Sequence, residues 1–98
     1  MDLGLAHAAA VVTGGSKGIG RATAMCLATD RARVCILARG QQALDQTVAA
    51  LRAAGSPDVF GISVDLGDAG EISAAFRTVG ERWGALNCLV NVGRCPAA

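Results

Sequence analysis

A glycine-rich stretch near the amino terminus carries the clearest chemical signal in this sequence. It reads Thr13-Gly14-Gly15-Ser16-Lys17-Gly18-Ile19-Gly20 and separates an apolar run from an amphipathic segment. Glycine permits a tight turn with positive φ, close approach of a ligand to the backbone, and close packing of a helix against a strand. A helix starting at about Gly18 would point unpaired N–H groups and its positive dipole end into the turn. The stretch therefore predicts a site for the phosphates of a dinucleotide.

Glycine spacing by itself also has a structural explanation, because strand-to-helix turns often contain glycine. The elements around the turn must therefore decide between a phosphate site and a purely structural turn. Apolar runs of strand length fall at residues 8–13, 34–38, 59–64 and 86–91. Amphipathic segments with helical period fall at residues 18–29, 41–54 and 68–83. The expected inward face of the first helix is Ile19, Ala22, Thr23, Cys26 and Leu27.

Two features of the third helical segment can be predicted from its residues. Asp68 and Glu71 have the spacing of a capping box at its start, with Asp in place of the usual Ser or Thr. Trp83 continues the apolar stripe, so we expect it in the core rather than as a stacking platform.

Strands that alternate with helices are joined by right-handed crossovers and lie parallel. The sequence therefore predicts an α/β fold, part of a doubly wound parallel sheet of the Rossmann type, with strand order 3-2-1-4. Ligands of such sheets bind at the carboxyl ends of the strands, where the order reverses. The glycine turn directly follows strand 1, so the topology supports a ligand site at the same place.

The composition suits this fold and argues against several other classes. The chain has 98 residues, enough for one small domain, and is 52% hydrophobic but only 3% aromatic. Its nine basic and eight acidic residues are scattered, which argues against binding to nucleic acid or to an anionic membrane. No apolar run approaches the roughly 20 residues of a membrane span, and no signal pattern opens the chain. We expect a soluble cytoplasmic protein.

The four cysteines and the single histidine form no metal-site pattern. The cysteines, Cys26, Cys35, Cys88 and Cys95, lack CxxC spacing, and three of them lie in apolar periodic segments. Reduced, buried thiols are the leading interpretation, and a disulfide or a metal site is the alternative. His7 has no neighbouring ligand residue and is expected at the surface. We expect no metal.

With these elements placed, the sequence resembles the short-chain dehydrogenase/reductase family. Residues 13–20 match the family's Thr-Gly-x-x-x-Gly-x-Gly turn at every fixed position. Asp65-Leu66 corresponds to the family's acidic residue after the third strand, whose carboxylate usually accepts a hydrogen bond from the adenine amino group. Asn91-Val92-Gly93 stands at the motif that normally reads Asn-Asn-Ala-Gly and lies along the adenosine, although it departs from that pattern at its second position and beyond. The likeness covers only the amino-terminal half of the family's domain, so residues 1–98 are expected to be the amino-terminal part of one NAD(P)-binding domain.

The resemblance also implies which dinucleotide is bound. NAD-preferring members usually end the second strand with a carboxylate, whereas this chain has Ala38 followed by Arg39. Arg39 and Lys17 stand where NADP-preferring members carry basic residues that hold the 2′-phosphate. We expect NADP, with NAD less favoured; the alternative is that both residues are solvated surface cations. The expected cofactor-binding residues are Gly14, Ser16, Lys17, Gly18, Ile19, Gly20, Arg39, Asp65, Leu66, Asn91, Val92 and Gly93.

The residues that perform the family's hydride transfer are not in this chain. That chemistry uses a Tyr, a Lys four residues later and an upstream Ser, whereas this chain has no tyrosine and Lys17 is its only lysine. We expect no catalytic residue here, so a carbonyl or alcohol substrate and an oligomer interface would need sequence beyond Ala98. The alternative is a non-catalytic, truncated nucleotide-binding module. A methyltransferase-type nucleotide fold is disfavoured, because such sites usually want an acidic residue where Ala38-Arg39 stands.

A further departure from the family concerns the backbone. The family usually has glycine where Arg31 stands, just after the first helix. A non-glycine residue held there at positive φ would cost on the order of 1 kcal/mol. We therefore expect local strain if the family's geometry is kept.

Overall fold

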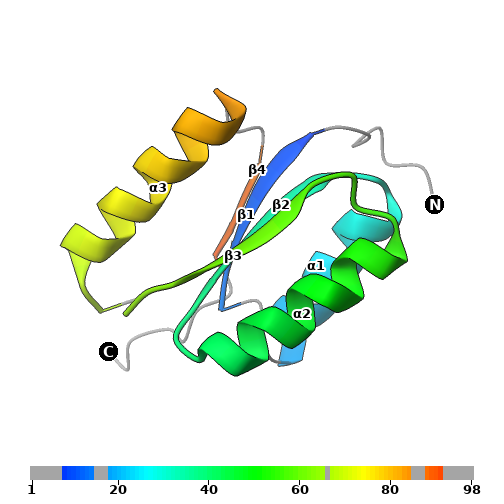
Figure 1. The fold of residues 1–98 in the computed structure, drawn as a ribbon, viewed down its shortest axis with the longest axis horizontal. Helices are drawn as coiled ribbons and strands as arrows, with labels where there is room; N and C mark the ends of the chain where they lie inside the picture. Colours follow the sequence, from blue (N-terminus) through cyan, green and yellow to red (C-terminus); the bar gives the residue numbers. More distant parts are fainter. Residues whose placement is uncertain (1–7, 15–17, 66, 85–87, 92–98) are drawn as a thin grey trace.

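The computed structural model describes residues 8–14, 18–65, 67–84 and 88–91, in which strands and helices alternate (Figure 1). The strands are β1 (Ala9–Thr13), β2 (Arg33–Ala38), β3 (Val59–Ser63) and β4 (Cys88–Asn91). The helices are α1 (Gly18–Thr29), α2 (Gln41–Ala54) and α3 (Ala69–Trp83). Every element expected from the sequence is present. The expected first residues of the last strand, and His7, lie outside the described residues.

The strands form one parallel sheet in the order β3-β2-β1-β4, as predicted (Figure 1). In the centre, Val11 of β1 lies opposite Cys35 of β2 and Leu89 of β4. Val11 and its neighbour Val12 are both fully buried although they point to opposite faces. The unbroken apolar runs of β1 and β2 therefore reflect a sheet that is covered on both sides.

Helices α1 and α2 cover one face of the sheet, and α3 lies on the other (Figure 1). The core beneath α1 and α2 contains Ala10, Val12, Ala24, Leu27, Ala28, Ala32, Val34, Ile36, Ala38, Leu44, Leu51 and Val59. The core beneath α3 contains Val11, Cys35, Leu37, Val64, Ala75 and Val79, with Phe60, Ile62, Phe76 and Trp83 packed at its margin. Trp83 packs against this core, as expected.

The predicted inward face of α1 is wrong by about one residue. Its buried residues are Gly20, Ala24, Leu27 and Ala28. Ala22 and Cys26, which we expected inside, are exposed. The helix consists almost entirely of small and apolar residues, so its periodicity distinguishes the faces poorly. The observed face is lined by the smallest side chains, which lets α1 approach the sheet closely.

The different buried face of α1 also changes the expected burial of one cysteine. Cys26 and Cys35 are free thiols, but Cys26 is exposed and Cys35 is completely buried. Burial raises the pKa of Cys35 to about 12, because the thiolate would lie in an apolar interior. The prediction of a buried thiol is therefore confirmed for Cys35 and wrong for Cys26. The side chains of Cys88 and Cys95 lie outside the described part of the chain.

Helices α1 and α2 end in the same hydrogen-bonded turn. After α1, Arg31 N donates to Ala28 O at 2.9 Å and Ala32 N donates to Leu27 O at 3.0 Å. These two bonds define a Schellman motif, which requires a left-handed residue after the helix. In α1 that residue is Arg31, with φ 66°. The positive φ expected at Arg31 is thus confirmed, whereas α2 has Gly55, with φ 128°, at the same point.

Candidate functional site

The predicted binding residues that the structure describes lie near one edge of the sheet, at the carboxyl ends of its strands. Gly14 follows β1, Arg39 follows β2, Asp65 comes two residues after β3, and Asn91 ends β4. Register places Thr13 of β1 opposite Asn91 of β4, across the point where the strand order reverses. The predicted residues Ser16, Lys17, Leu66, Val92 and Gly93 lie outside the described residues.

The glycine turn begins with a left-handed residue that ties β1 to β2. Gly14 has φ 70°, and its N–H donates to the carbonyl of Leu37 at 2.7 Å. The Gly14 N–H is therefore engaged by β2 rather than directed at a ligand. Helix α1 begins at Gly18 and has no acidic residue in its first turn. A carboxylate there would oppose an anion, so its absence suits a phosphate at the positive end of the helix.

An arginine directly follows Ala38, the last residue of β2. Arg39 is exposed and belongs to a bend between β2 and α2. Helix α2 begins at Gln41, and Gly40 is its N-cap. The N-cap makes no side-chain hydrogen bond, and the first turn of the helix has no acidic residue. Arg39 therefore comes just before a helix whose first turn carries no competing carboxylate.

The end of β3 is a loop held by its own acidic side chains. The carboxylate of Asp65 accepts from Gly67 N at 2.9 Å, and Asp65 N donates to Glu71 Oε1 at 3.1 Å. Asp68 Oδ1 caps α3 by accepting from Glu71 N at 3.1 Å, as predicted. The reciprocal half of the capping box is different from our expectation. Glu71 reaches Asp65 N instead of Asp68 N, because Asp68 N donates to Asp65 O within the loop.

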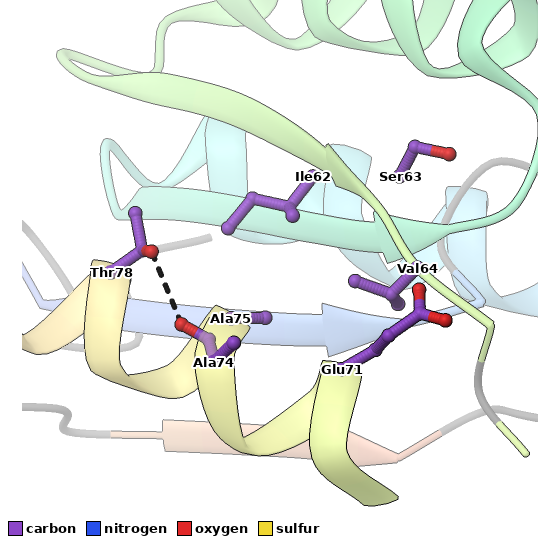
Figure 2. Close-up of a pocket in the computed structure, with 7 residues that line it drawn as sticks. All are labelled: Ile62, Ser63, Val64, Glu71, Ala74, Ala75 and Thr78. Atoms are coloured by element: carbon purple, nitrogen blue, oxygen red, sulfur yellow. Dashed lines mark hydrogen bonds between the residues drawn. The ribbon is translucent and has the colours of Figure 1, made fainter. Parts of the chain in front are cut away.

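An open hollow of about 210 Å³ lies between β3 and α3, beside this loop. Figure 2 shows its lining, which is Ile62, Ser63, Val64, Glu71, Ala74, Ala75 and Thr78. Most of this lining is apolar, and the hydroxyl of Thr78 already donates to Ala74 O (Figure 2). The hollow is not at the glycine turn and offers no cation for a phosphate.

Two residues of the site were missed or only partly understood from the sequence. Ser63, the last residue of β3, donates its hydroxyl to Arg39 O at 2.7 Å. Glu71 supports Asp65 in addition to its place at the start of α3. Neither role has a local sequence signal, because each depends on which strand or loop lies alongside.

The described ranges, residues 8–14, 18–65, 67–84 and 88–91, contain neither a membrane span nor a metal cluster. No helix there is long and apolar enough to span a bilayer. No three or more His, Cys, Asp or Glu side chains of that part of the chain are grouped so that they could hold a metal ion. A parallel, doubly wound sheet with a glycine turn and an acid-free helix start at its switch point defines an α/β nucleotide-binding protein.

Comparison with known proteins identifies the family within that class. The sequence matches the family described as short chain dehydrogenase over residues 8–95. It is 42% identical over 82 residues to the short-chain reductase protein NovJ of Streptomyces niveus, covering 84% of this chain and 31% of that protein. It is 37% identical over 82 residues to carbonyl reductase family member 4 of Danio rerio, covering 84% of this chain and 33% of that protein. The chain belongs to the short chain dehydrogenase family of oxidoreductases, which bind a nicotinamide dinucleotide.

Solved structures agree with this assignment. Glucose dehydrogenase of Caenorhabditis elegans superposes with a TM-score of 0.82 at 34% identity, over 89% of this chain and 38% of that one. L-Sorbose reductase from Gluconobacter frateurii, solved with NADPH and L-sorbose, superposes with a TM-score of 0.91 at 29% identity, over 99% of this chain and 37% of that one. The chain spans about a third of the length of the curated relatives it matches.

Proposed function

We propose that this chain is the NADP-binding portion of a short-chain oxidoreductase that transfers hydride between NADP(H) and a carbonyl or alcohol substrate. In this proposal, residues 1–98 form the amino-terminal part of a single dinucleotide-binding domain. The turn from Gly14 to Gly20 and the start of α1 hold the pyrophosphate. Asp65 and Leu66 contact the adenine, and residues 91–93 lie along the adenosine.

The observation that carries the cofactor preference is the exposed Arg39 at the end of β2. An NAD site usually has a carboxylate one residue earlier, at the position of Ala38, which binds the ribose hydroxyls and repels a 2′-phosphate. Here Arg39 comes two residues before the first residue of α2, whose first turn has no acidic residue. Charge-assisted hydrogen bonds to phosphate are among the stronger polar contacts in proteins, so a single arginine can shift the preference by about tenfold. The NADPH seen with L-sorbose reductase fits this proposal.

A second candidate is a nucleotide-binding module without catalytic activity. It is favoured by one observation: the chain has no tyrosine, and Lys17 is its only lysine, so the family's Tyr and Lys proton relay is not within these 98 residues. The two candidates share the cofactor site and differ in turnover. Oxidation of NADPH by aldehydes and ketones, followed at the absorbance of the reduced nicotinamide and measured on the native protein rather than on residues 1–98 alone, separates them.

Calorimetric titration of the chain with NADPH and with NADH tests the cofactor site. We expect NADPH to bind about tenfold more tightly, and Arg39→Ala to remove that difference while leaving the NADH affinity unchanged. Arg77→Ala, an exposed arginine of α3, is the matched control and should change neither affinity. Equal losses for both cofactors in Arg39→Ala would contradict the proposed role of the charge.

A further inference from the structure

The exit of β2 is held by an unbroken series of backbone contacts. Four successive carbonyls, from Leu37 to Gly40, each accept a hydrogen bond, and the donors come from the glycine turn, the end of β3 and α2. Leu37 O accepts from Gly14 N at 2.7 Å, and Ala38 O accepts from Val64 N at 2.9 Å. The segment that carries the exposed Arg39 is thus tied to the glycine turn on one side and to β3 on the other.

The next two carbonyls complete the series. Arg39 O accepts from the hydroxyl of Ser63 at 2.7 Å, and Gly40 O accepts from Leu44 N, in the first turn of α2, at 2.9 Å. The bond to Arg39 O is the only one of the four that a side chain makes. It can therefore be removed by substitution without changing the strand pairing.

The position of this bond matters because two peptide planes determine the backbone angles of a residue. For Arg39 these are the plane before it, held by Val64 N on Ala38 O, and the plane after it, held by Ser63 on Arg39 O. Together the two bonds restrict φ and ψ of Arg39 and so the direction in which its side chain leaves the backbone. Register supports the contact, since Ser63 lies opposite Ala38, the residue before Arg39.

We propose that Ser63 is a positioning residue for cofactor choice: its hydroxyl holds the backbone of Arg39 so that the guanidinium is preorganised for the 2′-phosphate of NADP. This inference rests on the proposed function, because it assumes that Arg39 contacts that phosphate. A held arginine loses less conformational freedom on binding than a free one, and the difference appears as affinity for the phosphorylated cofactor. NAD lacks the phosphate, so its affinity does not depend on Ser63.

The test is a double-mutant cycle on the chain, with NADP⁺ and NAD⁺ affinities measured by calorimetry. Ser63→Ala should lower the ratio of NADP⁺ to NAD⁺ affinity by about three- to fivefold, with the NAD⁺ affinity unchanged. Ser63→Thr keeps the hydroxyl and should keep the ratio. Ser63→Cys keeps the size but donates weakly and should resemble Ser63→Ala. Ser73→Ala, an exposed serine of α3, is the matched control and should leave the ratio as it is.

The Arg39→Ala background separates this inference from the proposed function. If Ser63 acts through Arg39, Ser63→Ala should not change the ratio further once Arg39 is alanine. If Arg39→Ala removes the NADP⁺ preference but Ser63→Ala leaves it intact, the positioning role is wrong and the proposed cofactor site stands. Equal weakening of both cofactors by Ser63→Ala would show a purely structural role and would also overturn the inference. If Arg39→Ala leaves the preference unchanged, the proposed NADP site fails and this inference fails with it.

Discussion

Asp58 directly precedes β3 and binds the carboxyl-terminal end of α3, at the end of the sheet opposite the candidate site. Its carboxylate accepts from Arg82 Nη2 at 2.6 Å, from Arg82 Nε at 3.0 Å, and from Trp83 Nε1 at 2.7 Å. The Trp83 ring packs edge-on against Phe60 at a centroid distance of 5.1 Å, and the Arg33 guanidinium lies 5.5 Å from the Trp83 ring centroid. The hydrogen bonds from Arg82 chiefly hold the pKa of Asp58 below its ordinary value of 3.8.

This pKa shift predicts a pH-dependent contribution to stability. A carboxyl with a lower pKa in the folded state stabilises the protein above its unfolded pKa and loses that effect as pH falls through its folded pKa. Asp58→Asn should lower the free energy of unfolding by about 1 kcal/mol at pH 7, because the ion pair is partly exposed. Urea unfolding of both proteins should show the difference shrinking below about pH 4. Glu81→Gln is the control on the same helix, and a pH-independent difference for Asp58→Asn would contradict the assignment.

The two described free thiols differ in exposure and should differ in reactivity. Cys26 is exposed, whereas Cys35 is buried with its pKa raised to about 12. Because the thiolate is the reactive form, iodoacetamide at pH 8 should alkylate Cys26 first and reach Cys35 only in denaturant. Peptide mapping by mass spectrometry measures both sites in one sample. Faster alkylation of Cys35 in the folded protein would contradict the described orientation of β2.

At the scale of elements, the end of α1 has a backbone conformation that its residue type does not favour. Both α1 and α2 close with a Schellman motif, but only α2 has glycine at the left-handed position. Gly55 is also constrained by space, since a Cβ there would lie 3.3 Å from Ala28 O. Arg31 lacks the conformational freedom of glycine, yet its φ is 66°. The Schellman motif is therefore kept at α1 although Arg31 is not glycine, because the hydrogen bonds to Ala28 O and Leu27 O require a left-handed backbone at this position.

Replacement of Arg31 by glycine should therefore stabilise the protein. A non-glycine residue in the left-handed region costs about 1 kcal/mol, so Arg31→Gly should raise the free energy of unfolding by up to that amount. Arg31→Ala removes the same side chain but keeps the Cβ, and so separates relief of the backbone from loss of the arginine. Chemical denaturation of the three proteins gives the comparison. A stability of Arg31→Gly equal to or below that of Arg31→Ala would exclude backbone strain at this position.

At the scale of the whole molecule, the sheet brings the glycine turn and the carboxyl ends of the strands to the same side. The carboxyl ends of all four described strands face one side, and the glycine turn follows the strand next to the reversal of order. Contacts at Leu37, Ala38 and Arg39 connect that turn to β2 and β3. A ligand bound at this edge would contact segments from across the sheet and would stabilise the fold as a unit.

Binding to the folded state alone should raise the melting temperature. At a ligand concentration of 100 times Kd, mass action adds about 2.7 kcal/mol to the free energy of unfolding. At equal concentrations, NADPH should therefore raise Tm more than NADH, and Arg39→Ala should make the two shifts equal. Differential scanning fluorimetry measures the shifts, and Arg77→Ala is again the control. A larger shift with NADH would contradict the assigned preference.

Much of the fold could be predicted because its signals are local. The apolar run of β1, the stripe of α2 and the cap at Asp68 each depend on residues adjacent in sequence. The strand order also followed, since right-handed crossovers leave few alternatives. The inward face of α1 was predicted wrongly because most of its residues are small or apolar, so their hydrophobicity marks one side only weakly. Exposure of Cys26 was misjudged for the same reason.

The amino-acid sequence by itself determined the order of elements, the glycine turn and the family, since each depends on residue types at short, regular spacing. Only the tertiary structure decided which side of α1 is buried, that Ser63 holds the carbonyl of Arg39, and that Glu71 supports Asp65 rather than closing the capping box. For the contact between Ser63 and Arg39, the physical reason is that a hydrogen bond between residues 24 positions apart depends on strand register. Register is a property of the packed sheet and not of either strand alone.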